Sequence, residues 1–228
     1  MQTETYDKKF YETRAYGKFN SANLRKSKNW FFGWLRYLNR FVDLESGRGK
    51  RSLEIGCGFG AVSNLLAERG FEAYASDVSQ YAVKEAQKLS PKIKLLKFDV
   101  QQEIPLSGEF DLILAFELLE HLQKPEKALI NIYRKLKKGG FFVCSTPFPY
   151  QRYLYSERML GHVNVKHPQE WSAIFEKIGF KKEDLLIKSV IFVPFFYHFH
   201  QVLSLVLPFN INLPYTNSTI FYIAKKNE

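Results

Sequence analysis

Between residues 51 and 191 the chain alternates short apolar runs with amphipathic stretches, and this alternation is the strongest constraint on its fold. Short apolar runs bounded by Gly, Pro or Ser are typical of strands, whereas apolar residues spaced three and four apart indicate helices. Strands that alternate with helices need crossover connections, which favour a parallel sheet covered by helices on both faces. The sequence therefore predicts a doubly wound α/β fold with a mostly parallel, seven-stranded sheet. The expected strands are 51–55, 71–76, 93–98, 110–116, 141–145, 185–193 and 219–224, and the expected helices are 29–42, 61–69, 79–89, 125–138 and 168–178.

Composition agrees with an ordinary globular protein, because 46% of the 228 residues are hydrophobic and 25% are charged. We expect one domain over 1–228, with an N-terminal helical cap (1–49), a core (50–185) and the last strands with an aromatic lid insertion between them (186–228). Two cysteines exclude a disulfide scaffold and favour a reducing compartment. The N-terminus has no apolar segment typical of a signal peptide. A cytoplasmic location is expected, with or without contact to the inner membrane surface.

Charge is distributed unevenly. Residues 1–51 carry 12 Lys and Arg against 5 Asp and Glu, whereas residues 189–224 contain no charged side chain. A basic head and an uncharged aromatic tail indicate an anionic or membrane-adjacent partner. The alternative is a solvated helix face at one end and buried strands at the other.

A glycine-rich loop follows the first expected strand. Gly56, Gly58 and Gly60 alternate with Cys57 and Phe59, and the loop opens a helix. Glycines permit a tight turn, and the free N–H groups of a helix N-terminus favour a carboxylate or a phosphate. The spacing also satisfies a loose dinucleotide fingerprint, so the loop by itself leaves the ligand open.

Acidic residues accompany the first three strands. Glu54 lies two residues before the first glycine, where a carboxylate suits a cationic amino group better than a pyrophosphate. Asp77 ends the second strand, 21 residues after Gly56, and can accept from two ribose hydroxyls, while Asp99 ends the third strand and can accept from an adenine amino group. Ligands of such sheets bind at the carboxyl ends of the strands, so the three acids predict a site for an amino acid, a ribose and an adenine. Each acid alone could instead be a helix cap or a loop acid.

The segment Leu-Glu-Ile-Gly-Cys-Gly-Phe-Gly (53–60) resembles the first motif of class I S-adenosylmethionine-dependent methyltransferases. Residues 110–122 resemble the fourth strand of that family with its Leu-Glu-His continuation, 136–142 its glycine turn, and 162–180 its helix before strand six. The similarity covers roughly residues 50–185 and is nearest to the branch of ubiquinone-biosynthesis O-methyltransferases and glycan- and natural-product-tailoring enzymes. It implies a Rossmann-like methyltransferase fold, with S-adenosyl-L-methionine as donor and S-adenosyl-L-homocysteine as product.

The resemblance also assigns the cofactor contacts. The glycine loop and Glu54 would face the methionine end, Asp77 the ribose, and the residues after the second and third strands the adenine. The end of the fourth strand would lie near the sulfonium. The implied contacts are Glu54, Gly56, Cys57, Gly58, Gly60, Asp77, Val78, Asp99, Val100, Phe116 and Glu117.

Methyl transfer to a neutral hydroxyl needs a base. Glu117, His121 and His162 are the candidates, and the first two are four residues apart, so that a helical turn would place them on one face. Structural hydrogen bonding is the alternative for His121, and a plain loop position is the alternative for His162. His198 and His200 lie among aromatics and are expected to pack or to belong to the lid.

Some chemistries are disfavoured. The Asn/Asp-Pro-Pro-Tyr segment of base amino-methyltransferases is missing after the fourth strand, and the similar 146–150 follows the fifth. Cys144 lies in an apolar strand, where a thiolate is unfavourable. We predict no metal site, because no His/Cys/Asp cluster has ligand spacing, although scattered carboxylates could still hold Mg²⁺.

The acceptor pocket is expected from the N-terminal segment and the insertions after the fifth and sixth strands. Residues 189–213 could form a lid, contact a membrane surface, or be plain core with 220–224 as an antiparallel edge strand. A transmembrane span is not expected, because prolines and polar residues interrupt the apolar run.

The predicted function is O-methylation of a small-molecule, glycan or lipid-linked, amphiphilic acceptor by in-line transfer. The alternatives are an RNA-modifying methyltransferase, which the basic head favours although nucleic acid is the less expected partner, and an NAD-binding protein of the same topology. The sequence does not define an oligomeric state.

Overall fold

The computed structural model describes residues 6, 8–12, 17–149, 161–191 and 218–227. Its strands are β1 (Arg51–Ile55), β2 (Glu72–Asp77), β3 (Lys94–Lys97), β4 (Phe110–Phe116), β5 (Leu136–Pro147), β6 (Leu185–Ile191) and β7 (Ser218–Lys225). Its helices are α1 (Lys8–Phe10), α2 (Ser21–Leu38), α3 (Ala61–Glu68), α4 (Gln80–Leu89), α5 (Pro125–Lys135) and α7 (Pro168–Ile178), with short 3-10 helices η2 (Leu119–His121) and η4 (Lys182–Asp184).

The strands form one seven-stranded sheet in the order β3-β2-β1-β4-β5-β7-β6. The pairs from β3 to β5 are parallel, whereas β7 lies between β5 and β6 and is antiparallel to both. The predicted mostly parallel sheet is therefore confirmed. The edge position considered for 220–224 is wrong, since β6 forms that edge.

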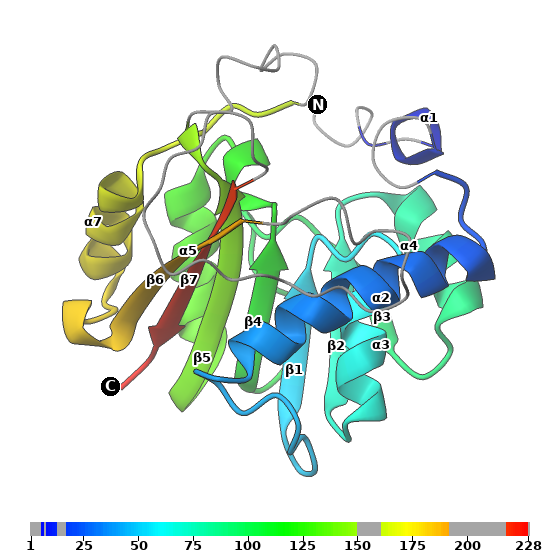
Figure 1. Ribbon diagram of the computed structural model, residues 1–228, viewed down its shortest axis with the longest axis horizontal. Coiled ribbons are helices and arrows are strands. Elements are labelled where there is room, and N and C mark those ends of the chain that lie inside the picture. The colour runs from blue at the N-terminus through cyan, green and yellow to red at the C-terminus, as the bar shows by residue number, and fades with distance from the viewer. Residues whose placement is uncertain (1–5, 7, 13–16, 150–160, 192–217, 228) are drawn as a thin grey trace.

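Helices cover both faces of the sheet (Figure 1). On one face α5 and α7 bury Leu129, Ile132, Trp171 and Phe175 against the strands. On the other face α2 and α3 pack their apolar sides against β4, β5 and β7. This is the doubly wound arrangement that the alternation of elements predicts.

Three helix boundaries differ from the prediction by more than one residue. The helix expected over 29–42 begins at Ser21, where the Asn20 side chain accepts from the Asn23 N–H, and it ends at Leu38. The helix expected to reach residue 138 ends at Lys135, because Leu136 already pairs with Phe110 in the sheet. The two glycines that suggested a helix end belong to an irregular start of β5 instead.

Close packing explains one of those glycines. A Cβ on Gly140 would lie 2.9 Å from the carbonyl oxygen of Lys137 and 3.0 Å from that of Phe110. Only glycine therefore fits this approach of the two backbones. The glycine pair thus marks a register shift between β4 and β5.

Candidate functional site

A cavity of about 650 Å³ opens where the parallel strands end. Its walls come from the turns after β1 to β4, from α1 and α2, and from the beginning of β7. Ligands of open parallel sheets bind at this place, at the carboxyl ends of the strands. The lining residues are Tyr6, Phe10, Tyr11, Asn23, Lys26, Ser27, Trp30, Phe31, Trp34, Ile55, Gly56, Asp77, Val78, Phe98, Asp99, Val100, Gln101, Phe116, Glu117, Leu118, His121, Leu122 and Thr219.

The glycine loop forms one wall through Gly56, whose φ is 75°. The N–H groups of Gly56 and Cys57 donate to the carbonyl oxygen of Ser76, which ties the loop to the end of β2. Gly60 is the residue before α3 and has a φ of 71°, and a Cβ there would meet Ile93 at 2.8 Å. Cys57 is buried, and burial raises the pKa of its thiol well above the usual value, which fits a packing role.

Glu54 is turned away from the cavity. Its Oε2 accepts from the Ser63 N–H at 2.8 Å and from the Ser63 hydroxyl at 2.7 Å, in the first turn of α3. Burial raises the pKa of Glu54 to about 7. Glu54 thus satisfies a helix N-terminus, and like Cys57, Gly58 and Gly60 it is not among the residues that line the cavity.

Asp77 and Val78 line the cavity at the end of β2. The Asp77 carboxylate organises the surrounding loops, because Oδ2 accepts from the Gly58 N–H at 3.1 Å and Oδ1 from the Ser79 N–H at 2.9 Å. Oδ1 also accepts from the Tyr11 hydroxyl at 2.8 Å. Burial raises the pKa of Asp77, and these hydrogen bonds oppose that effect. The Tyr11 hydroxyl therefore occupies an acceptor position that the resemblance assigns to a ribose hydroxyl.

Asp99 and Val100 line the cavity at the end of β3. Oδ1 of Asp99 accepts from the Gln101 N–H at 2.9 Å, and Val100 is buried. An acid and an apolar side chain thus lie side by side at this wall. Asp77 and Asp99 therefore converge on one cavity.

Glu117 lies at the end of β4 in a strained conformation. Its φ is 48°, the one positive φ of a non-glycine among the residues that the structure describes, and such a conformation is costly and concentrates at functional sites. The Ser145 hydroxyl donates to Oε1 of Glu117 at 2.7 Å, while the Glu117 N–H donates to the Ser145 carbonyl oxygen at 3.1 Å. Burial raises the pKa of Glu117. Phe116 precedes it and lines the cavity.

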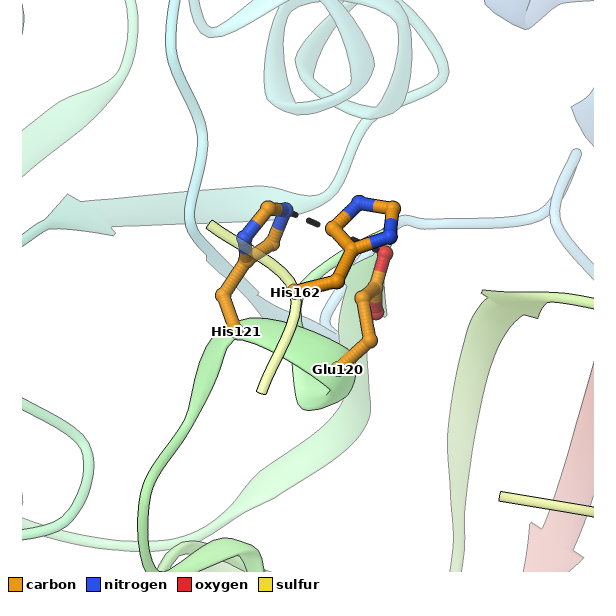
Figure 2. A group of neighbouring side chains, drawn as sticks. All are labelled: Glu120, His121 and His162. Atoms are coloured by element: carbon orange, nitrogen blue, oxygen red, sulfur yellow. Dashed lines mark ion pairs between the residues drawn. The ribbon is translucent and has the colours of Figure 1, made fainter. Parts of the chain in front are cut away.

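His121 lines the cavity. The ring of His162 packs against the ring of His121, with the two centroids 4.7 Å apart. Burial, with a smaller contribution from His162, lowers the pKa of His121 to about 4. Glu120 completes the group: the ligand atoms of Glu120, His121 and His162 all lie within 4.8 Å of one another (Figure 2). Spacing along the chain could not indicate this group, because the fold brings His162 in from a distant segment.

Tertiary contacts also bring in residues that the sequence did not indicate. Tyr11 reaches Asp77 across 66 residues, and Glu120 stands in the sequence only within the Leu-Glu-His continuation, with no role of its own assigned to it. Lys26 and Trp30 of α2 line the cavity, and they belong to the N-terminal segment from which part of the acceptor pocket is expected. The apolar period of α2 gave the one usable signal, since Trp30, Phe31 and Trp34 share its inner face.

Several predicted features lie outside the described residues. These are His198, His200 and residues 192–213 of the expected lid or membrane contact. Among the helices that the structure describes, none combines the length and the apolar character needed to cross a membrane.

A glycine loop, two acids at successive strand ends and a cavity that they line are typical of an α/β protein that binds a nucleotide-type cofactor. The model of a family described as a methyltransferase domain matches residues 28–185, which is more than half of the chain. The chain therefore belongs to the class I S-adenosylmethionine-dependent methyltransferase family.

Individual relatives support the same family. The mitochondrial ubiquinone biosynthesis O-methyltransferase of Schizosaccharomyces pombe is 32% identical over 106 residues, which are 43% of this chain and 38% of the relative. The ubiquinone biosynthesis O-methyltransferase of Dechloromonas aromatica is 32% identical over 103 residues, which are 43% of this chain and 44% of the relative. The chain thus matches less than half the length of these two curated relatives.

Solved structures share the fold. The magnesium protoporphyrin IX methyltransferase of Synechocystis PCC 6803, solved with bound S-adenosylhomocysteine, has a TM-score of 0.63 at 15% identity. The alignment covers 98% of this chain and 99% of that chain. The Rossmann-like methyltransferase fold that the resemblance implied is confirmed.

Proposed function

We propose that this protein transfers a methyl group from S-adenosylmethionine to a hydroxyl oxygen of a small acceptor with an apolar or aromatic body. The observation that carries the proposal is the convergence of Gly56, Asp77, Asp99 and Glu117, from the ends of four neighbouring strands, on one cavity. Two curated relatives are ubiquinone biosynthesis O-methyltransferases, and the structurally similar Synechocystis enzyme holds S-adenosylhomocysteine.

The residues that line the cavity carry the chemical groups that such a cofactor needs. Asp77 offers carboxylate oxygens suited to ribose hydroxyls, and Asp99 lies beside the apolar Val100, where an adenine would find an acceptor and a flat apolar contact. The Gly56 backbone leaves room for the methionine end. Glu54 would act on that end only through the loop, since its carboxylate is bonded to Ser63.

The chemistry needs alignment and one proton acceptor. The bound donor supplies a methyl group already activated by a sulfonium. The acceptor oxygen attacks the methyl carbon in line, the C–O bond forms as the C–S bond breaks, and the electron pair stays on sulfur. The hydroxyl proton passes to Glu117, which lines the cavity and whose raised pKa makes it a stronger base than an exposed glutamate. His121 is the weaker candidate, because its pKa is lowered to about 4.

The acceptor half of the cavity is aromatic with a basic edge. Trp30, Phe31 and Trp34 of α2 line it together with Phe10 and Lys26. Aromatic rings favour a planar or apolar body, and the ammonium group favours an anionic substituent. We therefore favour a small amphiphilic acceptor over RNA. Membrane contact through 189–213 stays a prediction.

Cofactor binding is tested by calorimetry with S-adenosylhomocysteine. We expect wild-type protein to bind it and to give no heat with NAD. Asp77→Asn should weaken binding by about 1–3 kcal/mol, because a charge-assisted hydrogen bond is lost. Tyr11→Phe is the matched control: it keeps the carboxylate, removes one of the two hydrogen bonds to Oδ1, and should bind at least as tightly as wild type. Equal affinity of Asp77→Asn and wild type would refute the ribose assignment, and binding of NAD alone would reverse the proposed function.

Turnover is tested with a labelled methyl donor and separate panels of phenolic, glycan, lipid-linked and RNA acceptors. We expect label in a small hydroxylated acceptor. Glu117→Gln should lower kcat by roughly 10²–10⁴-fold, because the proton acceptor is removed, and this loss should exceed any loss of S-adenosylhomocysteine affinity. Glu126→Gln, exposed in the first turn of α5, is the control that should retain full turnover. Full activity of Glu117→Gln would exclude it as the base, and label found only in RNA would favour the RNA-modifying alternative.

A further inference from the structure

The Tyr11 hydroxyl is a hydrogen-bond donor that the chain itself supplies to the Asp77 carboxylate. Tyr11 follows α1 and lines the cavity together with Phe10. Its hydroxyl donates to Oδ1 of Asp77 at 2.8 Å, and both side chains are buried, with exposed fractions of 5% and 4%. A side chain of the N-terminal segment is thus bonded to the carboxylate that the proposed function assigns to the ribose.

The Asp77 carboxylate has few acceptor positions left. Besides the Tyr11 hydroxyl, the N–H groups of Gly58 and Ser79 donate to it at 3.1 and 2.9 Å. The N–H group of Val78 is a further, weaker donor. The two oxygens of a carboxylate offer about four acceptor positions. The donors of the chain therefore nearly saturate this group, and two ribose hydroxyls can both bind to it only if a donor leaves.

Tyr11 is the donor that can leave. The three N–H groups belong to the glycine loop and to the turn after β2, and the bonds from Gly56 and Cys57 to the carbonyl oxygen of Ser76 tie these two turns together. The Tyr11 hydroxyl comes from a segment 66 residues away in the chain. A ribose hydroxyl offers the same O–H donor, so the exchange makes one hydrogen bond for each that it breaks.

We propose that the Tyr11 hydroxyl competes with the ribose of the cofactor for the Asp77 carboxylate, and that Tyr11 thereby sets the affinity for S-adenosylmethionine and S-adenosylhomocysteine. Without cofactor, the hydroxyl satisfies the buried carboxylate. In the complex, the ribose takes its position and Tyr11 withdraws. The observed affinity is then the intrinsic affinity reduced by the fraction of molecules in which Tyr11 is released. The proposal rests on the proposed function, because it takes Asp77 as the ribose site.

Other contacts keep the released hydroxyl close to the carboxylate. The Tyr11 ring packs near Phe19 and Tyr81, with centroids 5.7 and 6.5 Å apart, and the Tyr81 hydroxyl donates to Glu12 at 2.8 Å. None of these contacts involves Asp77, so the segment stays attached to α4 when the hydroxyl leaves. A competitor that is tethered in this way acts at a high effective concentration.

The competition affects the donor and the product alike. S-adenosylhomocysteine carries the same ribose as S-adenosylmethionine and differs from it only at the sulfur. Tyr11 therefore weakens both by the same factor. For the enzyme this limits how strongly the product is retained after the methyl group has been transferred, a step that often limits turnover.

The test compares wild type with Tyr11→Phe, which keeps the ring and removes only the hydroxyl. In calorimetry we expect the variant to bind S-adenosylmethionine and S-adenosylhomocysteine more tightly than wild type, by a similar factor of about threefold or more for each. Equal or weaker binding by Tyr11→Phe overturns the proposal. A gain restricted to one of the two ligands also overturns it, because it would place the effect of Tyr11 at the sulfur and not at the ribose.

A second substitution shows whether the gain depends on Asp77. In an Asp77→Ala background, Tyr11→Phe should change the affinity by less than about twofold, because the acceptor for which the two hydroxyls compete is gone. Tyr74→Phe is the matched control. It removes a hydroxyl that donates to Glu72 at 2.9 Å, and since Tyr74 is not among the cavity-lining residues, this variant should bind both ligands as wild type does. A gain from Tyr11→Phe that persists without Asp77 overturns the proposal.

Failure of the competition and failure of the proposed function give different results. Binding of S-adenosylhomocysteine that Tyr11→Phe leaves unchanged overturns the competition, while the cofactor assignment stands. Absence of S-adenosylhomocysteine binding to both wild type and Tyr11→Phe overturns the cofactor site and the competition with it.

Discussion

At the scale of single residues, the acids near the strand ends divide into two groups. Asp77, Asp99 and Glu117 reach the cavity, whereas Glu54 accepts from the Ser63 N–H and hydroxyl beneath the glycine loop. The difference arises because alternate residues of a strand point to opposite faces. Glu54 lies within β1, so the alternation of side chains along that strand sets the direction of its carboxylate. Asp77 is the last residue of β2, whereas Asp99 and Glu117 follow β3 and β4.

The burial of Glu54 makes stability depend on pH. Its pKa is raised from the ordinary 4.5 of the unfolded chain to about 7 in the folded chain, so the native state binds more protons between these values. Stability contributed by the protonated form is therefore present below about pH 4.5 and is lost as pH rises through about 7. The full loss is about 3 kcal/mol.

Glu54→Gln removes this dependence and keeps an oxygen that can accept from Ser63. Denaturant unfolding measures the free energy of unfolding of both proteins. We expect the wild-type value minus the variant value to fall by about 3 kcal/mol from pH 5 to pH 8, so that the variant gains relative to wild type at pH 8. Comparing the two proteins at each pH cancels the titration of other buried groups. A constant difference across this range would show that Glu54 does not titrate there.

At the scale of elements, α2 both supports the sheet and forms a cavity wall. Trp34 is 3% exposed and packs edge-to-face on Phe116 at 5.3 Å and on Phe221 at 4.9 Å between ring centroids. Leu35 and Leu38 are fully buried on the same face. Phe32, two residues before Trp34, is 49% exposed. Two large aromatic residues of one helix thus differ mainly in burial.

This contrast predicts the stability of two alanine variants. Trp34→Ala should lower the free energy of unfolding by about 3–5 kcal/mol, because it leaves a cavity between α2 and the sheet. Phe32→Ala should lower it by less than about 1 kcal/mol, since the ring is half in solvent. Urea unfolding measures both. Equal losses would mean that α2 is not held by the packing of Trp34.

At the scale of the whole molecule, the basic N-terminal charge is partly neutralised within the fold. Lys28 pairs with Glu68 at 2.5 Å, and Arg51 with Glu72 at 3.5 Å, while Lys26 faces the cavity. A solvated helix face with ion pairs thus accounts for part of the excess positive charge of residues 1–51. The alternative, an anionic partner, is supported by Lys26 in the cavity wall. The single domain over 1–228 stays a prediction.

Local patterns located most elements correctly. The strand at 110–116 and the helix at 168–178 agree with β4 and α7 to the residue, because a continuous apolar run and a helix bounded by Pro168 and Gly179 are local signals. The start of α2 was missed because its capping residue, Asn20, lies in a polar stretch without apolar period. The end of α5 was missed because pairing of Leu136 with Phe110 depends on a distant strand.

The sequence alone determined the order of strands and helices, the glycine loop, and the acids that end β2 and β3, since each depends on residues adjacent in the chain. Tertiary structure decided the direction of Glu54, the contact of Tyr11 with Asp77, and the grouping of Glu120 with His162. These depend on side chains from separate segments meeting in a packed interior. Residue periodicity records which face an element buries, but not which distant side chain it meets there.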